Sequence, residues 1–221
     1  MRKIRGIHYI VAPIIALMVL VLAYALSGQA GGLPYVPAGV TRGVPSESGT
    51  DVRAAAVSAL VVHQQIASSN LPALGAAPTL RSAPSTIEGP FAGNQISEPS
   101  LELLHATKVN KIQRHFSGKS VERELMAAEN IRIASRDPDF RALDSGVADV
   151  TFKSVSVSGS HADVKMTANA WASMAQKTPN GRWTTAVPHN AIDINMALDM
   201  DSSGRWLVST FAWTFAPGSE P

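Results

Sequence analysis

Cysteine is absent from the 221 residues of the chain. Its absence excludes disulfide bonds, thiolate-bound zinc and a lipid-modified cysteine. The fold must therefore depend on packing, hydrogen bonds and ion pairs alone. Aromatic residues are also few, at 6% of the chain, and all three tyrosines lie within the first 35 residues. A site farther along the chain has no phenol to use.

Charge of either sign is modest, since nineteen Lys and Arg against seventeen Asp and Glu leave a net charge of +2. The basic residues are mixed with acids and form no basic stripe with aromatics, so no nucleic-acid partner is expected. The sequence also lacks HExxH, Gly-x-Ser-x-Gly, a phosphate-binding loop and paired histidines at ligand spacing. We therefore expect no metal site and no cofactor.

One long apolar run is present near the amino end, at residues 9–26, with the sequence YIVAPIIALMVLVLAYAL. It begins at Tyr9 and ends at Leu26, and Pro13 lies near its start, where a missing N–H costs little. As a helix the run would rise ~27 Å, close to the ~30 Å hydrocarbon core of a bilayer. The run predicts one membrane-spanning helix, with the lipid bilayer as its partner.

The charges before this run predict its orientation. It is preceded by Arg2, Lys3 and Arg5, and no acidic residue occurs before Glu47. Positive flanks stay in the cytoplasm. We therefore expect a cytoplasmic tip and anchor over 1–27, with the carboxyl-terminal domain on the far side of the cell membrane.

A cleaved signal peptide is the alternative to an anchor. The residues before Ala30 are small enough for a signal peptidase, although the apolar run exceeds the ~7–15 residues usual for such signals. Cleavage after Ala30 would make the protein a secreted soluble factor.

The next segment, 28–97, is rich in Gly, Pro, Ala and Ser, and this composition predicts a flexible linker. One part of it has helical periodicity. Thr50 and Asp51 can cap a short helix over 51–68, whose apolar face would contain Val52, Ala56, Ala59, Val62 and Ile66. This helix could dock on the domain, pair with another protein, or form only transiently.

The remaining chain, 98–217, has the pattern of an α+β domain. A first helix is expected after Ser97, because its apolar residues recur every three or four positions: Leu101, His105, Val109, Ile112 and Phe116. Ser117 and Gly118 end it. Ser120 can cap a second helix, which would end before Asp137 and Pro138.

Alternation of apolar and polar residues then predicts four antiparallel strands in a meander. Glycines mark the three hairpin turns, at Gly159, Gly181 and Gly204. The strands around 162–176 and 182–200 are long, so they must curl, with Pro179 and Pro188 at bends or edges. The expected architecture is amino-terminal helices packed on a strongly curved antiparallel sheet, a cone with room for a pocket.

This order of elements, together with the ending DSSGRWLVS at 201–209, resembles the nuclear transport factor 2-like superfamily. The last hairpin of that superfamily often carries Gly-x-Trp-x-Val, which Gly204, Trp206 and Val208 match. With an anchor and a linker, the layout looks like membrane-anchored scaffolds of bacterial conjugation and type IV secretion, or like membrane proteins associated with Mce lipid transport.

The resemblance implies a non-catalytic accessory or scaffold module of a cell-envelope complex. Its partners would be other envelope proteins, with a homo-oligomer possible, and it would not be an enzyme.

The rival interpretation is a cone that binds a small apolar ligand or acts as an isomerase. Isomerases of the superfamily pair a base with a Tyr or acid donor, and this domain has no Tyr. His105 and Asp193 are the candidate pocket residues. The alternative for His105 is a histidine within the core. The alternative for Asp193 is a position on a solvated strand face, which Asp199 would share. Asp144 and Asp149 are expected in turns or caps, and His161 and His189 on the surface.

Tryptophans give the last candidates. Trp183 and Trp206, with Trp213, could line a pocket or an interaction patch, or belong to the core. Trp206 and Trp213 have opposite strand parity, so they should face opposite sides of the sheet unless a bulge intervenes.

Overall fold

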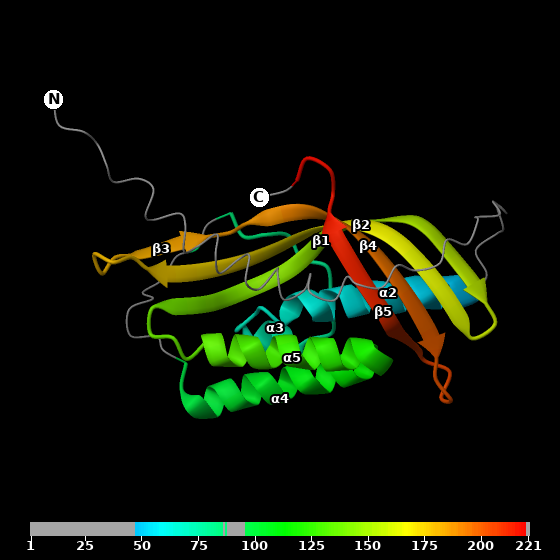
Figure 1. Cartoon of the computed structure of the whole chain (residues 1–221), viewed down its shortest axis with the longest axis horizontal. Coiled ribbons are helices and arrows are strands. Elements are labelled where there is room, and N and C mark those ends of the chain that lie inside the picture. Colours follow the sequence, from blue (N-terminus) through cyan, green and yellow to red (C-terminus); the bar gives the residue numbers. More distant parts are fainter. Residues whose placement is uncertain (1–46, 86, 88–95, 220–221) are drawn as a thin grey trace.

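The computed structural model describes residues 47–85, 87 and 96–219. Helices come first and strands follow, so the α+β class is confirmed. The described elements are, in order, α2 (Glu47–Gln65), α3 (Leu71–Gly75), α4 (Glu98–His115), α5 (Gly118–Ala134), β1 (Phe140–Ser158), β2 (His161–Lys177), β3 (Trp183–Ala186), β4 (His189–Met200) and β5 (Trp206–Phe215). Figure 1 shows α4 and α5 side by side beneath one face of a twisted sheet.

The five strands form one antiparallel sheet in the order β1-β2-β4-β5, with β3 also paired to β2. The three predicted hairpin glycines, Gly159, Gly181 and Gly204, have φ between +60° and +82°, a region that favours glycine. The predicted third strand is divided into β3 and β4 by Val187 and Pro188, because proline cannot donate to a ladder. The meander is otherwise as predicted.

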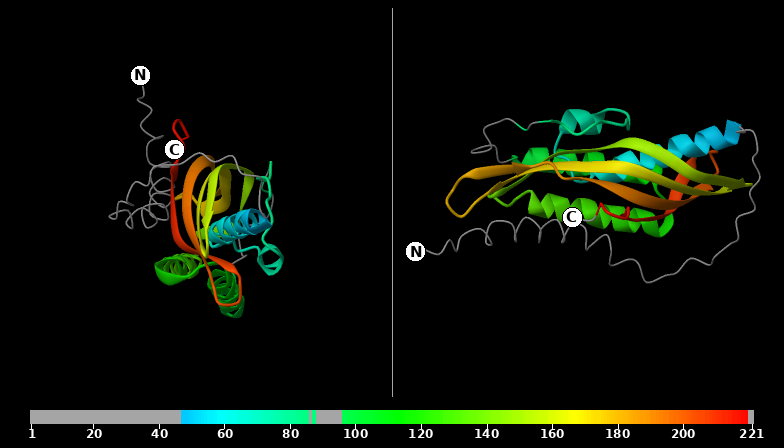
Figure 2. Two further views of the ribbon diagram at one scale, coloured as in Figure 1. Left: turned by 90° about the vertical axis from the view of Figure 1, so that its right-hand side faces the viewer. Right: turned by 90° about the horizontal axis from the view of Figure 1, so that it is seen from above.

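Helix α2 lies against the sheet and contacts β1, β2, β4, β5 and α4 (Figure 2). The predicted apolar face is buried, and so are Leu60 and Val61, which point in other directions around the helix. Burying a Val, Leu or Ile side chain contributes about 1.5–3 kcal/mol, so these contacts favour the docked helix. The linker prediction is therefore wrong for the described part of 28–97, and the docked helix is the alternative that the structure has.

The chain after α2 runs along the edge strand β1. Ser69 N–H donates to Leu143 O at 3.2 Å, and Arg81 N–H donates to Val147 O at 2.7 Å. Between them lies the short helix α3, capped by the side chain of Asn70. The folded unit therefore includes residues 47–85 as well as the predicted 98–217.

Helices α4 and α5 form a hairpin whose caps differ in part from the prediction. Helix α4 begins after Ser97 as expected, and Ser97 is its N-cap residue, with its Oγ accepting from Ser100 N–H. Ser120 is not a cap; its Oγ donates to Ser209 O at 2.9 Å, and Ser117 is the N-cap residue. Ser117 N–H donates to Val208 O at 2.9 Å. The start of α5 thus covers the open edge of β5, where carbonyls would otherwise lack donors.

A bulge in β5 changes which tryptophans share a face. Val208 pairs with Leu198 and Thr210 with Ala197, so Ser209 is an extra residue. This shifts the alternation, and Trp206, Val208 and Phe211 are all buried on the helix-facing side. Trp213 packs against the same core. The prediction that Trp206 and Trp213 face opposite sides of the sheet is therefore wrong. The bulge, which the prediction named as the exception, is the reason.

The predicted anchor, with Tyr9, Pro13, Leu26, Arg2, Lys3 and Arg5, lies outside the described residues, as does Ala30. Among the helices of 47–85, 87 and 96–219, none has the length and apolarity needed to span a bilayer.

Candidate functional site

The space between sheet and helices, where a pocket was expected, is filled with side chains. Met166 and Met196 are 0% and 3% exposed, and Trp206 is 8% exposed. They belong to one cluster with apolar residues of α2, with Ile112 of α4 and Phe116 directly after it, and with Ala128 and Ile131 of α5. The described part of the domain therefore has a close-packed core at the position of the predicted pocket.

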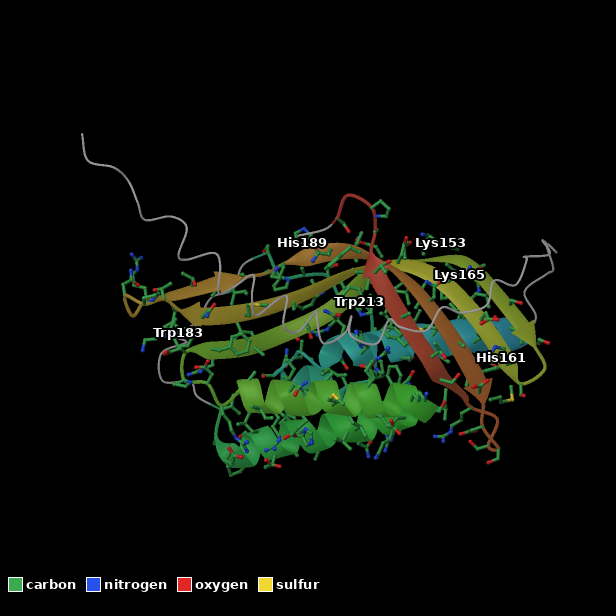
Figure 3. The ribbon with its side chains drawn as sticks, in the orientation of Figure 1. Lys153, His161, Lys165, Trp183, His189 and Trp213 are labelled. Carbon is green, nitrogen blue, oxygen red and sulfur yellow. The ribbon has the colours of Figure 1, made fainter. Side chains whose placement is uncertain are left out.

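Asp193 lies on the opposite side of the sheet, which we call the outer sheet face and define by Asp163, Lys165, Asn169, Asp193 and Asn195. Its carboxylate accepts a hydrogen bond from Lys153 Nζ at 2.7 Å. Figure 3 shows Lys153 and Lys165 on the side of the sheet away from α4 and α5. This position agrees with a solvated strand face, and the structure does not bring Asp193 together with His105.

The surface histidines lie near strand ends. His161 Nδ1 and Asp199 Oδ1 are 2.7 Å apart at the β1–β2 hairpin. The hydrogen bond to Asp199 and the charge of Asp163 raise the pKa of His161. His189 is exposed at the start of β4, next to Pro188 (Figure 3).

The two tryptophans proposed for the pocket have different environments. Trp206 is part of the core. Trp183 lies on β3 and is partly exposed, with the Arg141 guanidinium 5.1 Å from its ring centroid (Figure 3). Trp183 is therefore held by a cation–π contact at the β2–β3 end of the sheet.

His105 points into a crevice between α4 and α5, which also reaches the loop after α2. We call this the α4–α5 crevice; its lining residues are Ser69, Leu101, Leu104, His105, Lys108, Ala128, Arg132 and Ser135, and its volume is about 10 Å³. His105 Nε2 lies 3.8 Å from Glu129 Oε2, and its buried Nδ1 has no hydrogen-bond partner among the residues that the structure describes. The histidine faces neither the core of the sheet nor Asp193.

Lys108 lies one turn along α4 from His105 and was not singled out by the sequence, because a lysine reads as a surface residue. Lys108 is only 5% exposed, and burial lowers the pKa of its ammonium group to about 8. The structure gives it no hydrogen bond or ion pair within the described residues.

A buried carboxylate was also missed. Glu124 on α5 is 1% exposed and lies 2.7 Å from His63 Nδ1 of α2, while Arg123 Nη2 donates to its other oxygen at 3.1 Å. Burial by itself would raise the pKa of Glu124, but the charge and hydrogen bond of His63, with those of Arg123, outweigh it and lower the pKa. The His63 ring packs 4.5 Å from the ring of Phe211. These contacts fasten α2, α5 and β5 together.

Asp144 is the centre of a second polar cluster rather than a turn or cap residue. Its carboxylate accepts bonds from Ser68, Asn70, both terminal nitrogens of Arg81 and the Ser145 N–H, at 2.8–3.0 Å. Burial opposes ionisation, but the Arg81 hydrogen bond and the other donors outweigh it and lower the pKa of Asp144. The cluster holds the segment after α2 against β1. Asp149 lies in β1 at φ +51°, beside a bulge.

Within the described residues no three His, Asp or Glu side chains come together in a way that could hold a metal ion.

Comparisons with known proteins give distant likenesses. No protein-family model and no curated protein sequence matches the chain. A periplasmic fragment of TraM is similar at TM-score 0.43 and 10% identity, over 77% of this chain and all of that one. The intermembrane space region of the chloroplast protein ARC6 is similar at TM-score 0.38 and 14% identity, over 50% and 80% of the two chains.

An NTF2-like protein involved in plasmid conjugation is similar at TM-score 0.27 and 13% identity, over 52% of this chain and 42% of that one. All three TM-scores are below 0.5, so these likenesses carry no argument about what this protein does.

Proposed function

We propose that the protein is a membrane-anchored accessory or scaffold module of a cell-envelope complex, with a nuclear transport factor 2-like domain that acts through protein–protein contacts outside the cytoplasm. The observation that carries the proposal is the close-packed core. Met166, Met196 and Trp206 occupy the region where a ligand-binding or isomerase cone would hold its substrate. A filled core supports contact through the surface rather than chemistry within the domain.

The sequence supports the location. The apolar run at 9–26, with its three preceding cations, is long enough for a bilayer and orients the domain outward. Because α2 begins at Glu47, about twenty residues separate the run from the folded unit. Such a segment keeps the domain near the membrane surface, within reach of other membrane-anchored proteins.

Two surfaces of the domain differ in a way that an experiment can use. The outer sheet face is polar, and Lys165 and Asn195 lie opposite each other at its centre. Helix α4 presents a separate exposed surface at Asn110. A photo-crosslinking amino acid at Asn195 therefore probes the sheet, and the same group at Asn110 probes the helices.

The experiment combines topology with crosslinking in intact cells. A carboxyl-terminal tag should be reachable only from outside the cytoplasm, and illumination should give a discrete adduct with another envelope protein from one of the two positions. A tag reachable only from the cytosol would contradict the location. A monomeric protein with no adduct from either position would contradict the scaffold role.

A further inference from the structure

Two nitrogen groups line the α4–α5 crevice without a partner among the described residues: the ammonium of Lys108, a residue that is mostly buried, and the fully buried Nδ1 of His105. Lys108 is 5% exposed and has no hydrogen bond or ion pair among the described residues. His105 Nδ1 is buried in the same crevice and likewise has no partner. Buried polar groups are nearly always paired, and a buried charge without a counter-charge is costly.

The surroundings of the crevice supply no free acid. Arg132 is the third basic residue in the lining, and its guanidinium is already bonded to Glu102 at 2.8 Å and to Glu129. Glu129 approaches His105 only through Nε2, at 3.8 Å. Of the other lining residues, Leu101, Leu104 and Ala128 are apolar, and Ser69 and Ser135 are neutral and polar. The charged groups in the lining of the crevice are therefore all basic.

The size of the crevice limits what can enter. Its volume of about 10 Å³ corresponds to one water-sized group. A phosphate, a nucleotide or a lipid headgroup would not fit without movement of α4 and α5. One oxygen of a carboxylate has this size, and a halide ion, which is somewhat larger than a water molecule, would fit after a small widening of the crevice.

We propose that the α4–α5 crevice binds one small anionic group, a free halide or the carboxylate of a partner protein, between the ammonium group of Lys108 and the Nδ1–H of His105. The anion would neutralise the ammonium of Lys108 and accept hydrogen bonds from both unpaired donors, in short charge-assisted contacts. A water molecule can accept the same two hydrogen bonds, but it cannot neutralise the charge. The distinction between an anion and a water is therefore testable by charge.

The test measures heat unfolding of the purified full chain by tryptophan fluorescence at pH 7. Sodium chloride or sodium acetate is added while a bulky sulfonate salt keeps the ionic strength constant. A ligand that binds only the folded state raises Tm, by about 3–6 °C at ten times its Kd for a protein of this size. We expect a saturable rise with at least one of the two salts.

Variants assign the effect to the crevice. Lys108→Met should abolish the rise in Tm, and His105→Phe should weaken it at least several-fold in apparent Kd. Lys119→Met is the matched control. Lys119 is an exposed lysine on α5, so this substitution also removes one positive charge but lies outside the crevice. It should retain the full rise.

The two salts separate the possible sources of the anion. A rise with chloride alone indicates a free halide, and a rise with acetate alone indicates a carboxylate such as a side chain of a partner. The proposal is overturned if neither salt raises Tm of the wild type, or if Lys108→Met shows the same rise as Lys119→Met.

Discussion

Glu124 and Lys108 are two almost fully buried charged residues on neighbouring helices, and they differ in their partners. Glu124 on α5 contacts two basic side chains, His63 and Arg123. Lys108 on α4 contacts no acid within the described residues, and burial alone lowers its pKa, to about 8. The charge of Glu124 therefore helps to hold the helices together, while the charge of Lys108 lowers the stability of the folded protein.

The difference shows how a buried charge can be interpreted. A paired buried charge is explained by its structural contacts, and removing it lowers the stability of the protein because its partners are left buried and unpaired. An unpaired one has no such explanation within the domain, so it points to a group supplied from elsewhere. Four measurements test this contrast.

The largest effect is expected from Glu124→Ala. The variant leaves His63 and Arg123 without their acid and opens a space between α2 and α5, so unfolding free energy should fall by about 3–5 kcal/mol. Urea unfolding at pH 7 measures it. Glu122→Ala is the control, since Glu122 is exposed two residues away and should change stability by no more than about 0.5 kcal/mol. Equal effects of the two variants would contradict the structural role of Glu124.

The second effect is a rise in stability at alkaline pH. The pKa of Lys108 is lowered from 10.5 to about 8 in the folded protein, so between these values the unfolded chain binds more protons. Stability relative to Lys108→Met should therefore increase as pH rises from about 8 to 10.5, by about 3 kcal/mol, from 1.36 kcal/mol for each pKa unit.

The alkaline measurement has to be made without chloride or acetate, because a bound anion would keep Lys108 charged. The other titratable or charged groups lining the crevice are His105 on α4 and Arg132 on α5, and both are retained in Lys108→Met. A constant difference between the two proteins across this pH range would show that Lys108 is not buried as a cation.

The third effect is a gain in stability from Lys108→Met at pH 7 in the same buffer. Methionine has a similar length and no charge, so the variant should be more stable by about 1–3 kcal/mol. Guanidinium chloride would supply the proposed ligand, so urea is the denaturant to use. A loss of stability would mean that the ammonium has a stabilising partner in the protein itself.

The smallest effect is expected from Glu124→Gln, which keeps the shape of the side chain and loses its charge. The variant should be less stable than the wild type by about 1 kcal/mol at neutral pH, the difference between charged and neutral hydrogen bonds. Because the pKa of Glu124 is lowered from 4.5, this difference should be present above that pH and close as the pH falls through the folded-state pKa. Acid unfolding curves of both proteins check it.

Local patterns predicted much of the fold. Strand alternation and hairpin glycines gave the meander, because turn geometry at Gly159, Gly181 and Gly204 depends on the few residues around each turn. The apolar spacing at 51–68 correctly gave the buried face of α2. Composition then misled the linker prediction, since a Pro- and Ala-rich segment can be ordered when a helix within it is covered on several sides, as Leu60 and Val61 are.

The candidate site was predicted less well. His105 was placed on the inner face of α4, but the buried face of the helix is centred on Leu104 and Lys108, one position earlier. The spacing of apolar residues along α4 could not show that Lys108 belongs to the buried face, because a lysine side chain is expected to be exposed to solvent. Asp193 and Asp199 agree with the alternative of a solvated strand face.

By itself the sequence determined the start of a helix after Ser97, the strand order along the meander, and the absence of any disulfide or thiolate chemistry. These follow from contacts within a few residues or from composition. Only the tertiary structure decided that His63 meets Glu124 across 61 residues, that a bulge at Ser209 brings Trp206 to the core, and that Lys108 is buried away from every acid in the described part of the chain. Such pairings depend on how whole elements pack, and no local pattern encodes them.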